Sequence, residues 1–255
     1  MADIPLRLDL ALVRRGLARS RAEAQALLHA GQVSVSGCPV AKPSLLVSDT
    51  DRLEVSGTRC PYVSRAGLKL EAALETFGIA VSQRSALDIG ASTGGFSDCL
   101  LQRGAARVDA VDVGHGQLAP SLASEPRLCY REGINARALS PADFPAPFDL
   151  VVADLSFISL TLIVPVLPPL LRPHGDIVCL VKPQFEVGAH HLGKRGIVRS
   201  PQAQQAALEQ VRESARAAGL QERGCRDSPI LGSGGNREFL LWLAAKAGEP
   251  RPGME

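Results

Sequence analysis

Four charged residues of the sequence could perform acid–base chemistry together: Lys69, Asp154, Lys182 and Glu238. Asp154 ends the apolar run 148–154, and Lys182 ends the apolar run 176–182. Taken singly, each charge fits a solvated strand end. Placed together at neighbouring strand ends, a lysine and an aspartate cost free energy unless they pair or serve a function. The set therefore predicts a site in which a lysine removes a proton from a hydroxyl group.

A glycine-rich segment lies between the first two of these residues, in the stretch Asp88-Ile-Gly-Ala-Ser-Thr-Gly-Gly-Phe96. It follows an apolar run and precedes a helical pattern, so the sequence predicts a strand, a turn and a helix. The turn has neither the GxGxxG spacing of dinucleotide sites nor the Gly-Lys-Ser/Thr ending of a P-loop. A purely structural turn capped by Ser92 or Thr93 stays open as an alternative, and a dehydrogenase is a weaker one.

Acids on both sides of the turn favour S-adenosylmethionine as the cofactor. Asp112 ends the next predicted strand, where it could accept hydrogen bonds from ribose hydroxyls. A cofactor without phosphate needs no anion site at a helix N-terminus. The expected cofactor contacts are Asp88, Gly90, Ala91, Ser92, Thr93, Gly94, Gly95, Phe96, Asp112 and Asp154.

Features that the sequence lacks narrow the reaction. The segment Asp154-Leu-Ser-Phe157 lacks the Pro-Pro-aromatic run expected for methylation of amino nitrogens. Cys179 lies inside a predicted strand and not on a loop, which argues against a cysteine nucleophile that attacks a pyrimidine ring. Methylation of a hydroxyl group remains. A ribose 2'-hydroxyl needs a base because its proton must leave as the methyl group arrives.

The composition fits one medium domain with a small accessory module, since 45% of the 255 residues are hydrophobic and 21% are charged. The six cysteines show no CxxC spacing, so we expect reduced thiols and no metal site. No signal peptide opens the chain, and the apolar run 160–171 is interrupted by prolines and too short to span a bilayer. We expect a cytoplasmic monomer that does not bind membranes.

Residues 1–57 predict a small α+β module. Apolar residues predict a first helix that ends at Gly16, and Ser20 with Glu23 predicts a capping box for a second helix, Arg21–Ala30. Short alternating segments follow. Five arginines could contact RNA phosphates, although a solvated helix face explains them equally well: Arg7, Arg14, Arg15, Arg19 and Arg21.

Residues 58–62 are the expected linker, and residues 63–247 alternate between strands and helices. This rhythm predicts an α/β fold, Rossmann-like and doubly wound, with a mainly parallel seven-stranded sheet. We expect helices between the strands, a hairpin at the end and a disordered tail over 248–255. The expected strands are Ser85–Ile89, Arg107–Asp112, Arg127–Arg131, Phe148–Asp154, Asp176–Lys182, Cys225–Ile230 and Glu238–Ala245.

Several segments, in order along nearly the whole chain, resemble those of the TlyA family, whose members are often labelled hemolysin A. These segments are Tyr62-Val-Ser-Arg-Ala-Gly-Leu-Lys-Leu70, Asp88-Ile-Gly-Ala-Ser-Thr-Gly-Gly-Phe96, Val111-Asp-Val-Gly-His-Gly-Gln-Leu118, Asp154-Leu-Ser-Phe-Ile-Ser159, Val181-Lys-Pro-Gln-Phe-Glu186, Gly196-Ile-Val-Arg199 and Gly235-Asn-Arg-Glu-Phe239. The resemblance implies an S4-like RNA-binding domain followed by an FtsJ-like methyltransferase domain.

The resemblance also implies a reaction, because TlyA proteins are ribosomal RNA 2'-O-methyltransferases that use S-adenosylmethionine. Their target is a cytidine ribose in 16S rRNA, in 23S rRNA or in both. The family's Lys-Asp-Lys-Glu tetrad falls on the four charged residues, with Lys182 as the general base. Asn135 is expected near the adenine of the cofactor, and Arg65 joins the residues expected to contact RNA.

Two other functions stay open at this point. A ribosome-assembly factor could bind RNA and hold the cofactor without turnover, but such a binder does not need all four charged residues. A pore-forming cytolysin, which the family label suggests, has no support from a secretion signal, a membrane span or a long amphipathic helix.

Overall fold

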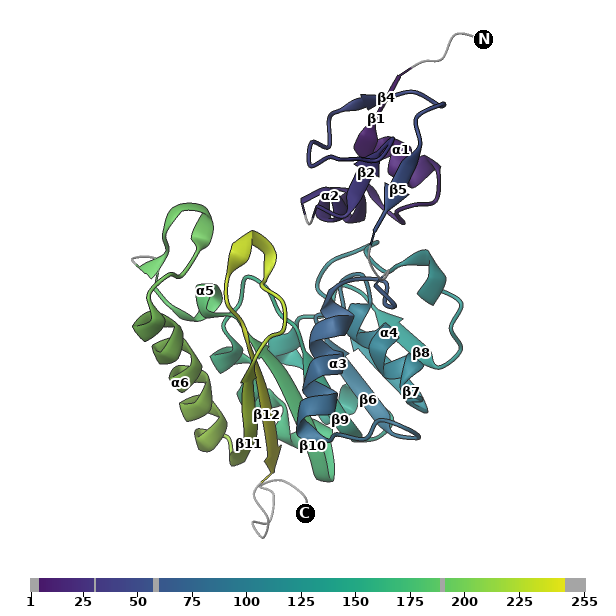
Figure 1. The fold of residues 1–255 in the computed structure, drawn as a ribbon. Coiled ribbons are helices and arrows are strands. Elements are labelled where there is room, and N and C mark those ends of the chain that lie inside the picture. The colour runs from purple at the N-terminus through teal and green to yellow at the C-terminus, as the bar shows by residue number, and fades with distance from the viewer. Residues whose placement is uncertain (1–4, 30, 57–59, 189–190, 246–255) are drawn as a thin grey trace. The chain divides into compact units, whose positions relative to one another are not determined.

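The computed structural model describes residues 5–29, 31–56, 60–188 and 191–245, and it divides into two compact units, Met1–Arg59 and Cys60–Glu255 (Figure 1). Each unit has its own hydrophobic core. Residues 58 and 59 of the expected linker and all of the expected tail, 248–255, lie outside the described residues.

The first unit packs two helices against short strands. Its core is formed by Leu8, Leu12 and Leu28 together with strand residues such as Val33. The two predicted helices are confirmed, although Ala30, the predicted end of the second, lies outside the described residues. The elements are β1 (Leu6–Arg7), α1 (Leu8–Arg14), α2 (Arg21–His29), β2 (Val33–Val35), β3 (Cys38–Pro39), β4 (Leu46–Val47) and β5 (Leu53–Val55).

Local contacts explain where α2 begins. The backbone N–H of Glu23 donates to Ser20 Oγ at 3.2 Å, as the capping box predicts. The Glu23 carboxylate reaches back one residue further than predicted, to the N–H of Arg19 at 2.5 Å. These two hydrogen bonds fix the start of α2 and the residues that precede it.

The second unit is built on one seven-stranded sheet, with the strand order β11-β12-β10-β9-β6-β7-β8. Strands β6 to β10 are parallel, and β12 runs antiparallel between β10 and β11. The predicted doubly wound, mainly parallel sheet with a final hairpin is confirmed. The strands are β6 (Ser85–Ile89), β7 (Arg107–Val111), β8 (Leu128–Arg131), β9 (Phe148–Ala153), β10 (Leu171–Val181), β11 (Leu220–Asp227) and β12 (Phe239–Ala245).

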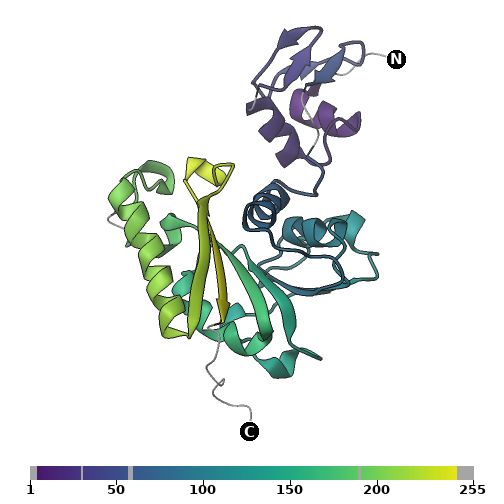
Figure 2. The ribbon, with the colours of Figure 1, turned by 60° about the horizontal axis from the view of Figure 1, so that its bottom comes forward.

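Helices cover both faces of this sheet (Figure 1, Figure 2). Helices α3 (Ala66–Phe77) and α4 (Gly95–Gln102) pack on one face, where they bury Leu150 and Val152 of β9. Helix α6 (Pro201–Ala217) packs on the other, over Val151 of the same strand. Burial on both faces explains why the central strands read as continuous apolar runs.

The connections differ from the prediction in one respect, because α-helices do not join every pair of strands. The crossovers that follow β7, β8 and β9 hold only 3₁₀ turns, and prolines at their first positions favour such short turns over long helices. The remaining helical elements are α5 (Pro183–Glu186) and the 3₁₀ turns Pro120–Leu122, Ala136–Ala138, Pro141–Asp143, Leu160–Leu162, Val164–Val166, Pro168–Leu170, Lys194–Gly196 and Ser233–Gly235.

Two strand boundaries were also predicted wrongly. β10 begins at Leu171, five residues before the predicted start, because Pro173 and Gly175 interrupt its apolar pattern around a register shift. β11 spans Leu220–Asp227 and not Cys225–Ile230. An edge strand exposes much of its surface, so its polar sequence carries a weak periodic signal.

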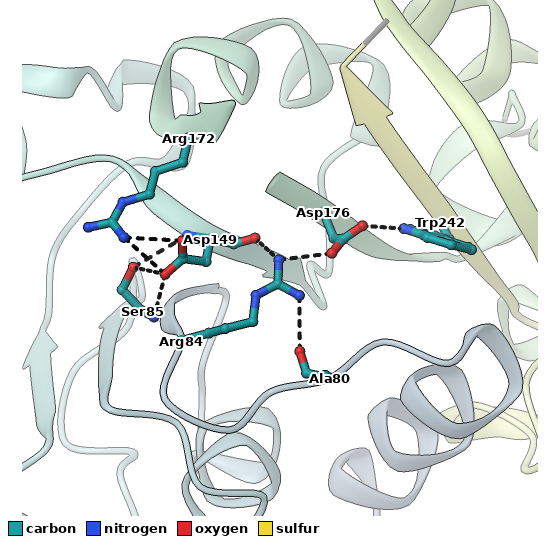
Figure 3. A network of polar contacts seen from close by, with 7 residues as sticks. All are labelled: Ala80, Arg84, Ser85, Asp149, Arg172, Asp176 and Trp242. Carbon is teal, nitrogen blue, oxygen red and sulfur yellow. Dashed lines mark hydrogen bonds and ion pairs between the residues drawn. The ribbon is translucent and has the colours of Figure 1, made fainter. Parts of the chain in front are cut away.

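Charged residues join four strands at the amino ends of the parallel sheet (Figure 3). Arg84 binds the carbonyl oxygens of Ala80 and Asp149, and it pairs with the Asp176 carboxylate at 2.8 Å. Asp176 also accepts the indole N–H of Trp242 at 2.9 Å. We call these residues, with Ser85 and Arg172 bound to the Asp149 carboxylate, the amino-edge network.

Candidate active site

The glycine turn connects β6 to α4 and lies tightly against the end of β9. Gly90 has φ +85°, and a Cβ atom there would lie 2.7 Å from the carbonyl oxygen of Asp154, so only glycine fits. Ser92 and Gly94 also have positive φ angles, of 49° and 91°. The predicted strand, turn and helix are present in the expected order.

Asp88 lies directly under this turn and is completely buried. Its Oδ2 atom accepts a hydrogen bond from Ser97 Oγ at 2.7 Å, whereas Oδ1 finds no hydrogen-bond partner among the residues described. Burial raises the pKa of Asp88 to about 7, and the nearby charges of Asp154 and Asp112 act in the same direction. A buried carboxylate oxygen without a donor is suited to receive an N–H group from a ligand.

Asp112 follows the end of β7 and holds the tip of the glycine turn. One carboxylate oxygen accepts the N–H of Ser92 at 2.8 Å, and the other accepts the N–H of Gly114 at 2.7 Å. Each carboxylate oxygen has two lone pairs, so both retain capacity for a further donor. Asp112 can therefore fix the turn and still accept hydrogen bonds from hydroxyl groups.

The four predicted catalytic residues form two close ion pairs. Lys69 Nζ lies 2.5 Å from Glu238 Oε2, and Lys182 Nζ lies 2.6 Å from Asp154 Oδ1. Lys182 also donates to Ser156 Oγ at 3.0 Å. Both lysines and Glu238 are buried, so each charge depends on its partner for stabilisation. Sequence reasoning predicted the four charges but missed Ser156.

Strand register explains how residues far apart in sequence reach one edge. Val181 of β10 pairs with Phe239 of β12, which places Lys182 and Glu238 at the carboxyl end of β10. β9 runs parallel to β10 and ends at the same edge with Asp154. Helix α3, which packs on this sheet, supplies the remaining lysine. Ligands of doubly wound folds bind at this edge.

Glu186 holds together the two loops that carry the second ion pair. Its carboxylate accepts the N–H of Leu160 at 2.9 Å and the hydroxyl of Ser159, which lie in the loop after Asp154. Glu186 itself ends α5, the short helix after Lys182. Burial raises the pKa of Glu186 above its ordinary value. This carboxylate fixes the spacing between the two loops.

Asn236 fixes the loop that carries Glu238. This side chain is 3% exposed, accepts the N–H of Val198 at 2.9 Å and donates to the carbonyl of Gly196 at 3.0 Å. A Cβ atom on Gly232 would collide with the Glu238 carboxylate, so the loop folds directly over this acid. Both Glu186 and Asn236 were missed by sequence reasoning, because their partners lie far along the chain.

Phe157 lies in the loop that follows Asp154 and is 92% exposed. Its φ angle is +65°, which is uncommon for a residue with a bulky side chain. The ring contacts that of Phe185 with 5.2 Å between centroids, so an aromatic pair joins the loop after Asp154 to the short helix after Lys182. An exposed aromatic ring offers a stacking surface for a planar ligand group.

The remaining predicted cofactor residues have mixed surroundings. Phe96 is part of the hydrophobic core, and Ala91 is nearly buried and bonds to β7 through its backbone. The Thr93 carbonyl accepts an N–H from the segment after β7. Asn135 is exposed and its side chain caps a 3₁₀ turn. Arg65, expected to contact RNA, is exposed and has no ion pair within the described part of the chain.

Two of the arginines expected to contact RNA in the first unit share one buried carboxylate. Arg7 binds Asp9 through two nitrogens at 3.1 and 3.0 Å, and Arg21 binds it at 2.8 Å. Gln25 adds a fourth hydrogen bond. Arg7 and the other donors hold the pKa of Asp9 well below its usual range, although burial opposes them. Each guanidinium has five N–H groups, so both arginines keep donors for a phosphate.

The other three arginines also make internal contacts. Arg14 pairs with Asp49, and Arg15 donates to two backbone carbonyls. Arg19 donates its backbone N–H to Glu23. The sequence predicted phosphate contacts or a solvated helix face for these arginines, and the structure adds contacts within the unit that orient the side chains of Arg14 and Arg15.

Neither a metal site nor a membrane span occurs in the part of the chain that the structure describes. No group of three or more histidine, cysteine or acidic residues that could hold a metal ion is present among the described residues. Within the same residues, no helix is long and apolar enough to cross a bilayer.

Comparison with known proteins assigns a family to each unit. A family model for FtsJ-like methyltransferases matches residues 62–245, and a model for S4 domains matches residues 6–53. The chain is 50% identical over 238 residues to the 16S/23S rRNA (cytidine-2'-O)-methyltransferase TlyA of Mycobacterium tuberculosis, which covers 93% of this chain and 89% of that protein.

Two further relatives carry a different label. Hemolysin A of Brachyspira hyodysenteriae is 40% identical over 236 residues, 92% of this chain and 98% of that protein. A solved structure named "Putative hemolysin from Streptococcus thermophilus" has a TM-score of 0.77 and 40% identity, and covers 99% of this chain and 92% of that chain.

Proposed function

Because the chain belongs to the TlyA family of FtsJ-like methyltransferases, we propose that it methylates the 2'-hydroxyl of a cytidine ribose in 16S rRNA, 23S rRNA or both. The observation that carries this proposal is the pair of lysine–carboxylate contacts at the carboxyl edge of the sheet, beside the glycine turn. A lysine placed there can take a proton from a hydroxyl group, as the reaction requires.

The residues around the turn fit S-adenosylmethionine as the methyl donor. Asp88 offers a buried oxygen without a donor, which suits the ammonium group of the cofactor. Asp112 retains lone pairs for the ribose hydroxyls, and Gly90 keeps the turn close to Asp154. S-adenosylmethionine supplies a methyl group that is electrophilic because it is bonded to a sulfonium.

Lys182 acts as the general base in this proposal. In its neutral form it accepts the proton of the ribose 2'-hydroxyl on Nζ as the oxygen becomes methylated. Asp154 and Ser156 hold Nζ at 2.6 and 3.0 Å, which fixes the direction of its lone pair. Asp154 also stabilises the ammonium that the proton transfer creates.

The other ion pair has a positioning role. Glu238 holds Lys69 Nζ at 2.5 Å, and an ammonium has three donors, so further N–H groups of Lys69 are available to the ribose or the 2'-oxygen. Phe157 supplies an exposed ring on which the cytosine base could stack, once the nucleotide leaves its helix. The arginines of the S4 unit supply phosphate contacts.

Transfer of labelled methyl groups from S-adenosylmethionine to unmodified small and large ribosomal subunits tests this function. We expect label in 2'-O-methylcytidine after digestion to nucleosides, and its loss with Lys182→Ala. Arg223→Ala, on the exposed surface of β11, is the control and should retain the wild-type rate. Binding to subunits without any methyl transfer would replace the enzyme by an assembly factor.

A further inference from the structure

The segment from residue 191 to residue 199, here called the basic loop, separates α5 from α6. It contains Lys194, Arg195 and Arg199, all of them exposed. The surrounding sequence 187–208 contains no aspartate or glutamate. Positive charge is therefore concentrated on this loop with no acidic residue nearby in sequence.

The three cations also lack the partners that most arginines of this unit have. Neither Lys194, Arg195 nor Arg199 forms an ion pair with any residue that the structure describes. Elsewhere in the unit, eight arginines pair with carboxylates: Arg84, Arg103, Arg107, Arg127, Arg172, Arg212, Arg216 and Arg237. Unpaired and exposed cations keep their full charge and all their donors for an outside partner.

The basic loop is fixed to the active site through Asn236. This buried side chain bonds to both Gly196 and Val198, and it lies two residues before Glu238. Gln204 of α6 adds a hydrogen bond to the Val198 carbonyl at 2.7 Å. The loops before α6 and before β12 project from the same end of the sheet (Figure 1). Charge on the basic loop is therefore presented at a fixed position beside the catalytic acid.

Backbone geometry supports a role beyond solubility. Arg195 has φ +64°, a left-handed conformation that is strained for a non-glycine residue. Such residues cluster at binding and catalytic sites. The 3₁₀ turn Lys194–Gly196 carries both Lys194 and Arg195. Asn236 donates a hydrogen bond to the carbonyl of Gly196, the last residue of this turn.

We propose that the basic loop is a docking surface of the catalytic unit for the phosphate backbone of RNA, next to the nucleotide that is methylated. This inference rests on the proposed function, because it takes ribosomal RNA as the substrate. The cations are exposed and spread along a loop, which suits an extended polyanion better than a small phosphate ligand. Docking here brings the ribose-bearing strand to the loop that carries Glu238.

The test uses the full chain with Lys194→Glu and Arg199→Glu together, which leaves the strained Arg195 in place. We expect the Kd for ribosomal RNA fragments to rise roughly tenfold or more at moderate salt. The slope of log Kd against log salt concentration should fall by about 1 for each phosphate that the variant no longer binds. Affinity for S-adenosylmethionine should stay at the wild-type value, which shows that the variant is folded.

Two further variants make the result specific. Lys194→Gln with Arg199→Gln removes charge without reversing it and should give an intermediate Kd. Arg223→Glu with Arg226→Glu reverses two exposed charges of β11 that also lack carboxylate partners among the described residues, and it should leave the Kd within about twofold of wild type.

Several outcomes would overturn the inference. Wild-type RNA affinity in the basic-loop variant would do so, as would an equal loss in the β11 variant, which would mean diffuse charge attraction. Weaker binding to intact subunits with unchanged binding to free RNA would assign the loop to an acidic protein partner. If the wild-type chain bound no ribosomal RNA at all, the proposed function itself would fail.

Discussion

Two clusters of buried or half-buried charge lie at opposite edges of the same sheet, and they are built differently. In the amino-edge network, Arg84 binds two backbone carbonyls and a carboxylate, and Asp176 binds both Arg84 and Trp242 (Figure 3). At the carboxyl edge, Lys69 and Lys182 each hold one carboxylate. Arginine spreads its charge over several fixed partners, whereas lysine keeps donors that remain uncommitted.

This difference in side-chain type suits one end of the sheet to stability and the other end to proton transfer. A guanidinium cannot give up its proton in a protein, so a network of arginines joins strands but cannot act as a base. A lysine can exchange its proton, and few partners hold each lysine here: Glu238 for Lys69, and Asp154 with Ser156 for Lys182. The amino edge is therefore suited to hold β6, β9, β10 and β12 together, and the carboxyl edge is suited to react.

The largest expected effect comes from Lys182→Gln. Glutamine keeps a hydrogen-bond donor for Asp154 but cannot accept a proton as lysine does, so the rate of methyl transfer should fall by about 100-fold to 10,000-fold. The free energy of unfolding should fall as well, by about 1–3 kcal/mol, because the Asp154 carboxylate loses its cation but keeps a hydrogen-bond donor. Single-turnover rates and urea unfolding measure the two quantities. A loss of less than tenfold would remove Lys182 from the role of base.

Arg84→Met should lower stability without changing the rate. Removing the guanidinium deprives one oxygen of Asp176 and the carbonyls of Ala80 and Asp149 of this donor, so the free energy of unfolding should fall by about 2–3 kcal/mol. The rate per folded molecule should equal the wild-type rate. Urea unfolding of this variant beside Lys182→Gln gives the comparison. A reduced rate at full folding would show that the two edges are coupled.

The pH dependence of cofactor affinity sharpens the comparison at Asp88. Its folded pKa, about 7, is above the ordinary aspartate value, so the buried carboxyl binds a proton below pH 7 that a cofactor ammonium must displace. Affinity for S-adenosylmethionine should rise about tenfold from pH 6 to pH 8 and level off above the pKa. Calorimetry at several pH values measures this change. In Asp88→Asn the affinity should be weaker and nearly independent of pH; a parallel pH profile would contradict the assignment.

Trp242→Phe should have the smallest effect. It removes the hydrogen bond to Asp176 but keeps an aromatic ring near Phe77, with which Trp242 stacks at 5.6 Å between centroids. The free energy of unfolding should fall by about 1 kcal/mol, and methyl transfer should not change. Thermal unfolding detects this shift. A change in rate would again show that the amino edge communicates with the site.

Sequence reasoning found the parts of the molecule whose signals are local. Apolar runs marked the parallel strands, and the residues just after them, Asp154 and Lys182, could be placed at one edge because parallel strands end together. The glycine turn was visible because Gly90 and Gly94 must adopt positive φ angles. The crossovers were predicted wrongly because apolar residues between prolines resemble a helix in composition.

Long-range polar contacts could not be predicted in the same way. Glu186 holds the loop after Asp154, and Asn236 holds the loop that carries Glu238. Their partners, Leu160 and Val198, lie 26 and 38 residues away in sequence. Arg7 and Arg21 were predicted to contact RNA or to lie on a solvated helix face, and the sequence does not show that Asp9 is buried between them. Three-dimensional proximity decides these roles, and side-chain type alone does not.

The close approach of Gly90 to the Asp154 carbonyl has a consequence for how such an enzyme can vary over evolution. The backbone N–H of Asp154 also donates to the Ile89 carbonyl at 3.1 Å, so the glycine turn is joined directly to the residue that pairs with Lys182. A methyl group added at position 90 would displace both at once. Variation that retunes the proposed cofactor site must therefore arise elsewhere, at positions such as Asp112, whose side chain bonds to Ser92 at the tip of the turn.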